Sequence, residues 1–380
     1  MITLRTWAPA AVLTLLALSA PAQPVAARPA ADGPAPARTV SAWLPYWQQE
    51  GGYRSALAHA DQLHTVSPFW YEMTGPEQFT EHPGAGELRI VEGLQRAGIK
   101  VLPTVTEAPG ARAMAELLGD PTRRATHVRA LLRLAESRPY DGLDLDYERM
   151  NEDAEPEVLR RVREGFSALV DEVCGALHDR GKQCTVAVYP RTEGEDSARV
   201  YDYARLGRSV DRLRIMGYNL HDALGPPGPL TSPDWYDAIL RYATAQVPAR
   251  KIEMGIPAYG WDYRVGDSGR ALHRTTREAQ ALRKRVGARY EWDEASRTPH
   301  FSYLDEGRRR VVWYQDSRGI GAHLPTLHAH GVVNTALWAL DFEEPALWKT
   351  LANGARDQAR ARAGNGNGNG NGNGNGNGRP

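Results

Sequence analysis

The feature that most constrains the fold of this 380-residue chain is a series of eight short apolar runs, separated mostly by helical patterns. This alternation is typical of an α/β protein with a parallel sheet, because a helix carries the chain from each strand to the next. Eight strands joined in this way indicate a closed (β/α)8 TIM barrel. The predicted strands are 40–44, 65–70, 100–105, 141–148, 184–189, 213–218, 252–258 and 334–340.

The clearest helix is predicted for residues 156–177, where apolar residues recur at three- and four-residue steps and form one stripe. Pro156 suits the first turn of a helix, and Gly181 lies just beyond the predicted end. Shorter helices are expected at 128–134 and 235–244.

A long interval between the seventh and eighth predicted strands interrupts this rhythm. It contains a helical pattern and three short patterns typical of antiparallel strands, before a last crossover helix. We therefore predict a barrel domain over 39–355 that carries a small α+β insertion over 262–314. Within this interval the predicted elements are a helix at 276–286, strands at 289–292, 300–303 and 310–314, and the crossover helix at 319–330.

The fourth predicted strand is the acidic stretch Asp141-Gly142-Leu143-Asp144-Leu145-Asp146-Tyr147-Glu148, in which apolar and acidic residues alternate from Leu143 onward. Because side chains alternate along a strand, Asp144, Asp146 and Glu148 are expected on one face. Three neighbouring carboxyl groups in a half-buried site will not all ionise, so at least one should have a raised pKa, as a general acid requires. Simple solvation of acids at a strand end is the alternative. A calcium loop fits poorly, because Arg149 stands where such a loop needs glycine.

The pattern D-G-x-D-x-D-x-E resembles the signature of glycoside hydrolase family 18, the chitinase-like barrels. The resemblance implies hydrolysis of β-1,4-linked N-acetylglucosamine polymers, in chitin or in the glycan of peptidoglycan, with retention of configuration and without a cofactor or metal. It also implies roles for three catalytic residues. Glu148 would donate the proton, Asp146 would hold the acetamido N–H of the substrate, and Asp144 would share a proton with Asp146.

Aromatic and polar residues stand at the ends of several other predicted strands, as expected for a sugar-binding groove. Met216-Gly217-Tyr218-Asn219 resembles the M-x-Y-D/N pattern of the family, which implies that Tyr218 positions the acetamido group. Asn219 stands where many members have Asp. Trp338 matches the tryptophan beneath the central sugar. The further candidates for substrate binding are Trp43, Trp70, Tyr189 and Tyr259.

Two segments bear on the position of the chain within the family. Residues 103–106 (Pro-Thr-Val-Thr) replace the S-x-G-G pattern that the family has on its third strand. Residues 67–70 and 312–316 resemble the bacterial branch related to spore-cortex lytic N-acetylglucosaminidases.

Two other functions remain open at this stage. The first is a chitin- or peptidoglycan-binding lectin on the same barrel, although such lectins usually lack the acid at Glu148. The second is a metal-dependent hydrolase, for which His64 and His221 are the nearby candidates without a ligand-like spacing.

The ends of the chain indicate export. Arg5 followed by an apolar run over 10–20 predicts a signal peptide at 1–22, with a membrane anchor as the alternative. An Ala/Pro-rich linker is expected at 23–38, and the Gly-Asn tail within 356–380 is expected to be disordered. We therefore expect a secreted protein that is not bound to a membrane after signal cleavage.

The net charge of the chain bears on its binding partners, and its two cysteines bear on a disulfide. The formal net charge is zero, which argues against nucleic acid as a partner. The family resemblance implies a polysaccharide partner, and we expect the protein to be a monomer. Cys174 and Cys184 would close a short loop between a helix and the next strand, and the sequence leaves open whether they form a disulfide.

Overall fold

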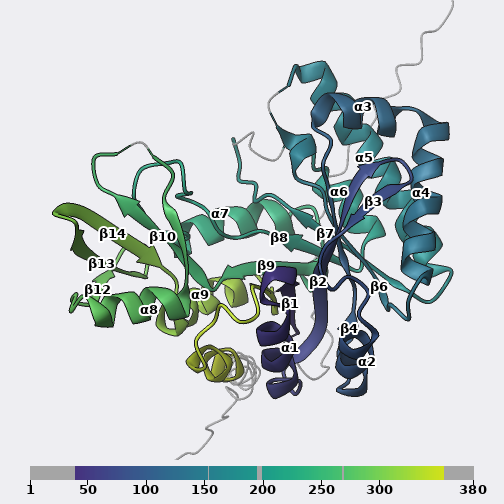
Figure 1. The fold of residues 1–380 in the computed structure, drawn as a ribbon. Helices are drawn as coiled ribbons and strands as arrows, with labels where there is room; N and C mark the ends of the chain where they lie inside the picture. Colours follow the sequence, from purple (N-terminus) through teal and green to yellow (C-terminus); the bar gives the residue numbers. More distant parts are fainter. Residues whose placement is uncertain (1–38, 153, 195–198, 268, 355–380) are drawn as a thin grey trace, which may run out of the picture. The chain divides into compact units, whose positions relative to one another are not determined.

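The computed structural model describes residues 39–152, 154–194, 199–267 and 269–354 (Figure 1). The predicted signal peptide, the linker up to residue 38 and the Gly-Asn tail lie outside these residues. Among the described residues, no helix combines the length and the apolar character needed to cross a bilayer.

The predicted barrel is confirmed. Its parallel strands follow one another around the sheet, and β1 pairs with both β15 and β2, which closes the ring. The strands are β1 (Val40–Pro45), β2 (Leu63–Gly75), β4 (Lys100–Val101) with β5 (Thr104–Glu107), β6 (Gly142–Asp146), β7 (Gln183–Val188), β8 (Arg212–Ile215), β9 (Ile252–Pro257) and β15 (Asn334–Trp338).

The third strand of the barrel is split into β4 and β5 around Pro103. Proline has no backbone N–H to donate to a neighbouring strand. The chain nevertheless stays in the sheet, because Leu102 N–H bonds the carbonyl of Val66 at 3.0 Å and the carbonyl of Pro103 accepts the N–H of Asp144 at 3.1 Å. The prediction of one strand over 100–105 therefore gives the right place, and β5 continues to Glu107.

Helices surround the ring between successive strands (Figure 1). In α5, the predicted stripe is buried from Val162 to Leu177, and the helix begins at Pro156 as expected. Gly181 has the left-handed φ of 69° that favours glycine at a helix end. The helices are α1 (Gln49–Ala58), α2 (Leu88–Arg96), α3 (Ala111–Gly119), α4 (Pro121–Glu136), α5 (Pro156–His178), α6 (Tyr203–Ser209), α7 (Pro233–Thr244) and α9 (Ser317–Ala329), with single turns η1 (Tyr46–Gln48), η2 (Arg149–Asn151) and η3 (Ala249–Lys251).

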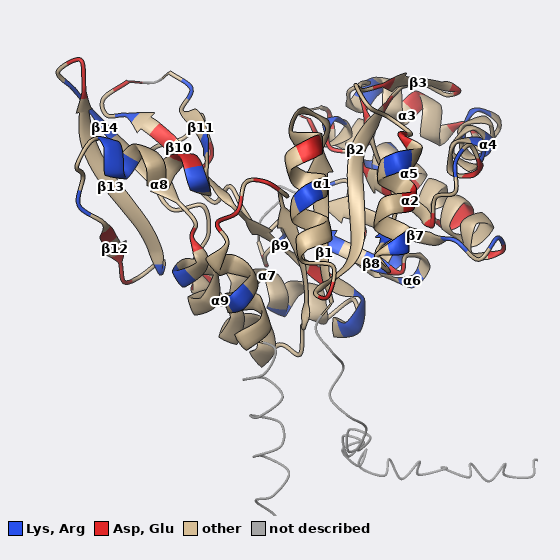
Figure 2. Cartoon of the chain, turned by 60° about the horizontal axis from the view of Figure 1, so that its bottom comes forward, with Lys and Arg blue, Asp and Glu red and all other residues tan. Residues whose placement is uncertain are grey.

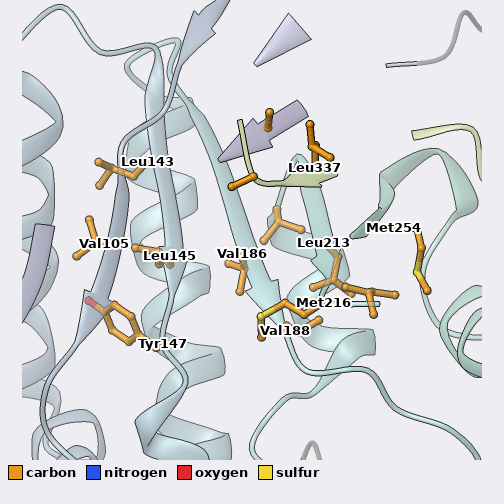
Figure 3. Packing of buried hydrophobic residues seen from close by; sticks show 14 of the residues in the cluster. Val105, Leu143, Leu145, Tyr147, Val186, Val188, Leu213, Met216, Met254 and Leu337 are labelled. Carbon is orange, nitrogen blue, oxygen red and sulfur yellow. The ribbon is translucent and has the colours of Figure 1, made fainter. Parts of the chain in front are cut away.

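A disulfide joins Cys174 in α5 to Cys184 in β7, and both cysteines are fully buried. The bond links the long helix to the strand that follows it. Leu143 and Leu145 of β6, with Tyr147 just beyond the strand, lie on the outer face of the ring, where they pack with Val105 and Val186 (Figure 3). The alternate residues Asp144 and Asp146 consequently face the interior of the barrel.

The insertion between β9 and β15 is a five-stranded antiparallel sheet with one helix. Asp262 is fully buried and holds this sheet together, because it bonds Arg310, Arg274 and the hydroxyl of Tyr303. Figure 2 shows basic and acidic residues interspersed over this sheet and the barrel helices. The elements are β10 (Tyr259–Arg264), β11 (Leu272–Thr275), α8 (Thr276–Arg285), β12 (Glu291–Asp293), β13 (Thr298–Asp305) and β14 (Arg308–Tyr314), and β3 (Gln78–Glu81) is an antiparallel partner of β2 elsewhere in the chain.

Candidate active site

Asp144 is the deepest carboxylate of the acidic motif and is fully buried in the barrel. Its Oδ2 accepts hydrogen bonds from Trp43 Nε1 and Thr104 Oγ1, both at 2.9 Å. Its Oδ1 accepts the hydroxyl of Thr185 at 2.6 Å and lies 3.1 Å from Arg214 Nη1. The side chain is therefore held by residues of four other strands, β1, β5, β7 and β8, and does not line the cavity described below.

Asp146 lies nearer the carboxyl end of β6, and its surroundings differ from those of Asp144. Its Oδ1 is buried and has no hydrogen-bond partner among the described residues. Burial raises the pKa of Asp146 well above its ordinary value, and the nearby Glu148 and Asp144 act in the same direction. A carboxyl group in this setting holds its proton more tightly than it would in water.

Glu148 lies just beyond the strand rather than on it, because β6 ends at Asp146. Its backbone has φ −113° and ψ −38°, and it precedes the single turn η2. Burial raises the pKa of Glu148, and a hydrogen bond from Tyr189 opposes that rise. We predicted three carboxyl groups on one face of one strand. Asp144 and Asp146 do lie on β6, whereas Glu148 lies in the turn that follows it.

Glu107, at the end of β5, holds this turn and was not among the predicted site residues. Its Oε2 accepts the backbone N–H of Glu148 and its Oε1 accepts that of Met150, both at 2.8 Å. Burial raises the pKa of Glu107 to about 8, although the two backbone hydrogen bonds act against the rise. A sequence signal existed, since Glu107 closes the third apolar run in the way that Glu148 closes the fourth.

One cavity of about 710 Å³ brings most of the predicted site residues together. It opens where the carboxyl ends of the barrel strands meet the insertion, the usual place of an active site in this fold. Its lining contains no lysine or arginine among the described residues. The lining residues are Asp146, Glu148, Asn151, Glu152, Tyr189, Pro190, Met216, Tyr218, Asn219, Leu220, Asp222, Trp235, Tyr259, Trp261, His273 and Trp338.

Tyr218 and Asn219 follow β8 and face this cavity. The Tyr218 ring lies 6.0 Å from that of Tyr259, edge to face. Asn219 adopts a φ of 67°, a left-handed conformation that asparagine tolerates better than most residues. Its Oδ1 accepts the Tyr259 hydroxyl at 2.6 Å and Trp261 Nε1 at 3.1 Å. Trp261 is, with Tyr259, among the aromatic residues that the sequence places at the end of the seventh predicted strand, and it lines the cavity from β10 of the insertion.

Trp338 ends β15 and forms an aromatic group with neighbouring rings. Its ring centre lies 5.4 Å from that of Phe69 and 6.5 Å from that of Trp47. Trp47 is half exposed, at 50%. The aromatic surface therefore continues from the cavity toward the end of β1, and Trp47 is a second residue that the sequence analysis did not single out.

Two predicted sugar-binding tryptophans lie elsewhere. Trp43 is 1% exposed and donates its indole N–H to Asp144, so it supports the acidic motif from below. Trp70 is fully buried and donates to Gln49 Oε1 at 2.6 Å. Neither lines the cavity. Both stand near strand ends in the sequence, and only the direction of the strand pleat turns them away from solvent.

No group of three or more histidine, cysteine, aspartate or glutamate residues among those described is arranged to hold a metal ion. Of the two histidines considered from the sequence, His221 Nδ1 lies 3.0 Å from the carbonyl of Pro226, and His64 is exposed on β2.

The model of the family "Glycosyl hydrolases family 18" matches residues 43–343. The uncharacterized glycosylase YvbX of Bacillus subtilis is 27% identical over 244 residues, which cover 63% of this chain and 69% of that protein. The cortical fragment-lytic enzyme of the same organism is 28% identical over 200 residues, or 50% of this chain, and the match spans only 46% of that enzyme. Among solved structures, a chitinase from Chromobacterium violaceum has a TM-score of 0.73 and 27% identity, with 84% of this chain and 99% of that one covered.

Proposed function

The chain belongs to glycosyl hydrolase family 18 and is a glycosidase; from this premise, we propose that it cleaves β-1,4-linked N-acetylglucosamine polymers by substrate-assisted, retaining catalysis. The observation that carries the proposal is the meeting of Asp146, Glu148 and Tyr218 in one cavity with Trp338. Family 18 enzymes are exceptions among retaining glycosidases, because the substrate supplies the nucleophile.

In the proposed first step, Glu148 donates its proton to the glycosidic oxygen and the sugar leaving group departs. The acetamido oxygen of the substrate attacks the anomeric carbon and forms a bond to it, which gives a cyclic oxazolinium ion. Burial, which raises the pKa of Glu148, helps it to hold the proton that this step needs. Asp146 would accept the acetamido N–H, and its Oδ1 has no partner among the described residues, which supports this role.

In the second step, Glu148 takes a proton from water, whose oxygen attacks the anomeric carbon and reopens the ring with net retention. Tyr218 would orient the acetamido group, and Trp338 would lie beneath the central sugar, since an aromatic face packs well on the C–H groups of a pyranose ring. The lining without lysine or arginine suits a neutral sugar. Trp47 and Phe69 offer further aromatic surface for a second sugar unit.

Incubation with chitooligosaccharides and, separately, with purified peptidoglycan tests this proposal, with the products identified by mass. Cleavage between N-acetylglucosamine units, and its loss in Glu148→Gln, is expected. Binding without products from either polymer would favour a lectin. Because the curated relatives include a cortical fragment-lytic enzyme and the solved structures include a chitinase, both substrate arms are needed.

We further propose that the protein is exported and acts outside the cell. The signal-like segment at 1–22 and the buried disulfide support this, because disulfides persist mainly in oxidising compartments. N-terminal sequencing of the protein from the culture medium should begin at Gln23. Retention of the full N-terminus in the cytoplasm would contradict export.

A further inference from the structure

A guanidinium group is buried inside the barrel directly beside the acidic motif. Arg214 lies on β8 and is 1% exposed, and strand alternation turns it inward while Leu213 packs outside. Its Nε donates to Glu253 Oε2 at 2.9 Å, and its Nη1 donates to Ser67 Oγ at 2.6 Å. The same Nη1 lies 3.1 Å from Asp144 Oδ1. Arg214 thus joins two buried carboxylates across the interior of the ring.

The contacts of Asp144 are those of an ionised carboxylate. Each of its oxygens faces one group that can only donate: the indole N–H of Trp43 at Oδ2 and the guanidinium of Arg214 at Oδ1. The hydroxyls of Thr104 and Thr185 supply a second donor to each oxygen. Arg214 also lies over the Trp43 ring, 5.4 Å from its centre. Because Trp43 and Arg214 can only donate, a proton on Asp144 would need the hydroxyl of Thr104 or Thr185 to turn and accept it.

Arg214 itself remains charged in this setting. Burial disfavours its charge, but Asp144 and Glu253 more than offset that cost, and the net effect raises the pKa of Arg214. Glu253 has further support from the hydroxyl of Ser41 at 2.9 Å. Arg214 therefore keeps its positive charge beside Asp144 and Glu253.

Asp146 contrasts with Asp144, although only one residue separates them. Burial raises the pKa of Asp146, and the three neighbouring carboxyl groups raise it further. The positive charge of Arg214 lowers the pKa of Asp146 and opposes that rise. The titratable and charged groups that act on or beside Asp146 are Asp144, Glu148 and Glu107, the cation Arg214, and the phenols of Tyr189, Tyr201 and Tyr218.

We propose that Arg214 is a positioning residue of this active site, which pairs with the Asp144 carboxylate and so confines the exchangeable proton of the acidic motif to Asp146 and Glu148. The inference rests on the proposed function and refines it. In the family resemblance, Asp144 and Asp146 share one proton. In this chain, the cation takes Asp144 out of that exchange, and the acid–base work falls to the two carboxyls that line the cavity.

The test compares the pH dependence of kcat in Arg214→Met, Arg214→Lys and the wild-type protein. Removal of the cation leaves the motif with one more net negative charge, so the carboxyls hold their protons more tightly. The basic limb of the profile should move upward by about one pH unit or more in Arg214→Met. Arg214→Lys keeps the charge and should hold the limb near its wild-type position, even if kcat falls.

Glu253→Gln is the matched control, because it removes the other charged partner of the guanidinium and keeps the cation. Its basic limb should not move upward, although its melting temperature should fall. A limb that stays in place in folded Arg214→Met, or moves upward equally in Arg214→Lys or Glu253→Gln, overturns the proposal. Arg214→Gln, which retains donors for Ser67 and Asp144, replaces the methionine variant if that variant does not fold.

A second readout does not depend on turnover. Infrared difference spectra across pH report the carbonyl band of protonated carboxyl groups. Arg214→Met should gain such a band, and the double variant Arg214→Met/Asp144→Asn should lack it. If the wild-type protein hydrolyses no N-acetylglucosamine polymer, the proposed function fails, while this measurement still decides the role of Arg214. Absence of the new carbonyl band in Arg214→Met refutes the proposed role of Arg214.

Discussion

Glu107 and Glu148 are linked through the backbone: the Glu107 carboxylate accepts the N–H of Glu148 at 2.8 Å, and its second oxygen accepts the N–H of Met150. The end of one barrel strand thereby fixes the turn that follows the next. The proposed catalytic acid is thus oriented by a neighbouring carboxyl group, which also lies close enough for the Glu148 charge to raise its pKa.

Glu107→Gln should weaken this turn. A glutamine offers one acceptor oxygen where the carboxyl group of Glu107 offers two, so one backbone N–H loses its partner, at a cost of about 1–3 kcal/mol. We expect a lower melting temperature and a lower kcat with KM less affected, measured on chitooligosaccharides. An unchanged kcat in the folded variant would show that the Glu107 contacts do not orient Glu148.

The same residue predicts how stability depends on pH. The pKa of Glu107 is raised from 4.5 to about 8 in the folded protein, so the folded state binds its proton more tightly than the unfolded state. Its contribution to stability is fully present below pH 4.5 and is lost as the pH rises through about 8. Denaturant unfolding across this range should show a shallower decline in Glu107→Gln than in the wild-type protein. Equal slopes would contradict the assignment.

Asn219 occupies a position where many relatives are expected to have aspartate, and its Oδ1 already accepts two hydrogen bonds. Asn219→Asp keeps both acceptor contacts and adds a negative charge to the cavity that contains Glu148. Because a like charge raises the pKa of a carboxyl group, the basic limb of kcat/KM should move to higher pH. Asn219→Ser, which adds no charge, is the control. A shift of the Asn219→Asp limb to lower pH would contradict the predicted electrostatics.

The disulfide between Cys174 and Cys184 closes a loop over a sequence separation of 10. Replacement of both cysteines by serine should lower the free energy of unfolding by roughly 2–4 kcal/mol. Both positions are fully buried and neither lines the cavity, so kcat should change little at temperatures where the variant is folded. A wild-type melting temperature that does not respond to reductant under unfolding conditions would argue against the bond.

The barrel could be predicted because its signals are local. Apolar runs mark the strands, and the stripe in α5 with Pro156 and Gly181 marks a helix and both its ends. The position of the acidic motif could also be predicted, because the alternation of side chains along β6 is enough to place Asp144 and Asp146 inside the ring.

The rest of the site depends on contacts between strands distant in the sequence. Trp43 and Trp338 both stand at strand ends, yet Trp43 points into the core and bonds Asp144 while Trp338 lines the cavity. Arg214 interrupts an apolar run, a visible signal for a buried ion pair, but its partner Glu253 belongs to the next strand. These roles depend on which face of the strand each side chain occupies and on the register between strands. The sequence pattern of a single strand does not contain this information.

The measurement that tests the central claim most directly follows the anomeric proton by NMR during cleavage of a chitooligosaccharide by the wild-type protein and by Glu148→Gln. The account predicts that the wild-type protein first releases the β-anomer, and that Glu148→Gln loses about 10²–10⁴-fold in rate while keeping its fold. Glu164→Gln, an exposed change on α5, serves as the control and should behave as the wild type does. First release of the α-anomer, or undiminished turnover in Glu148→Gln, would contradict the account.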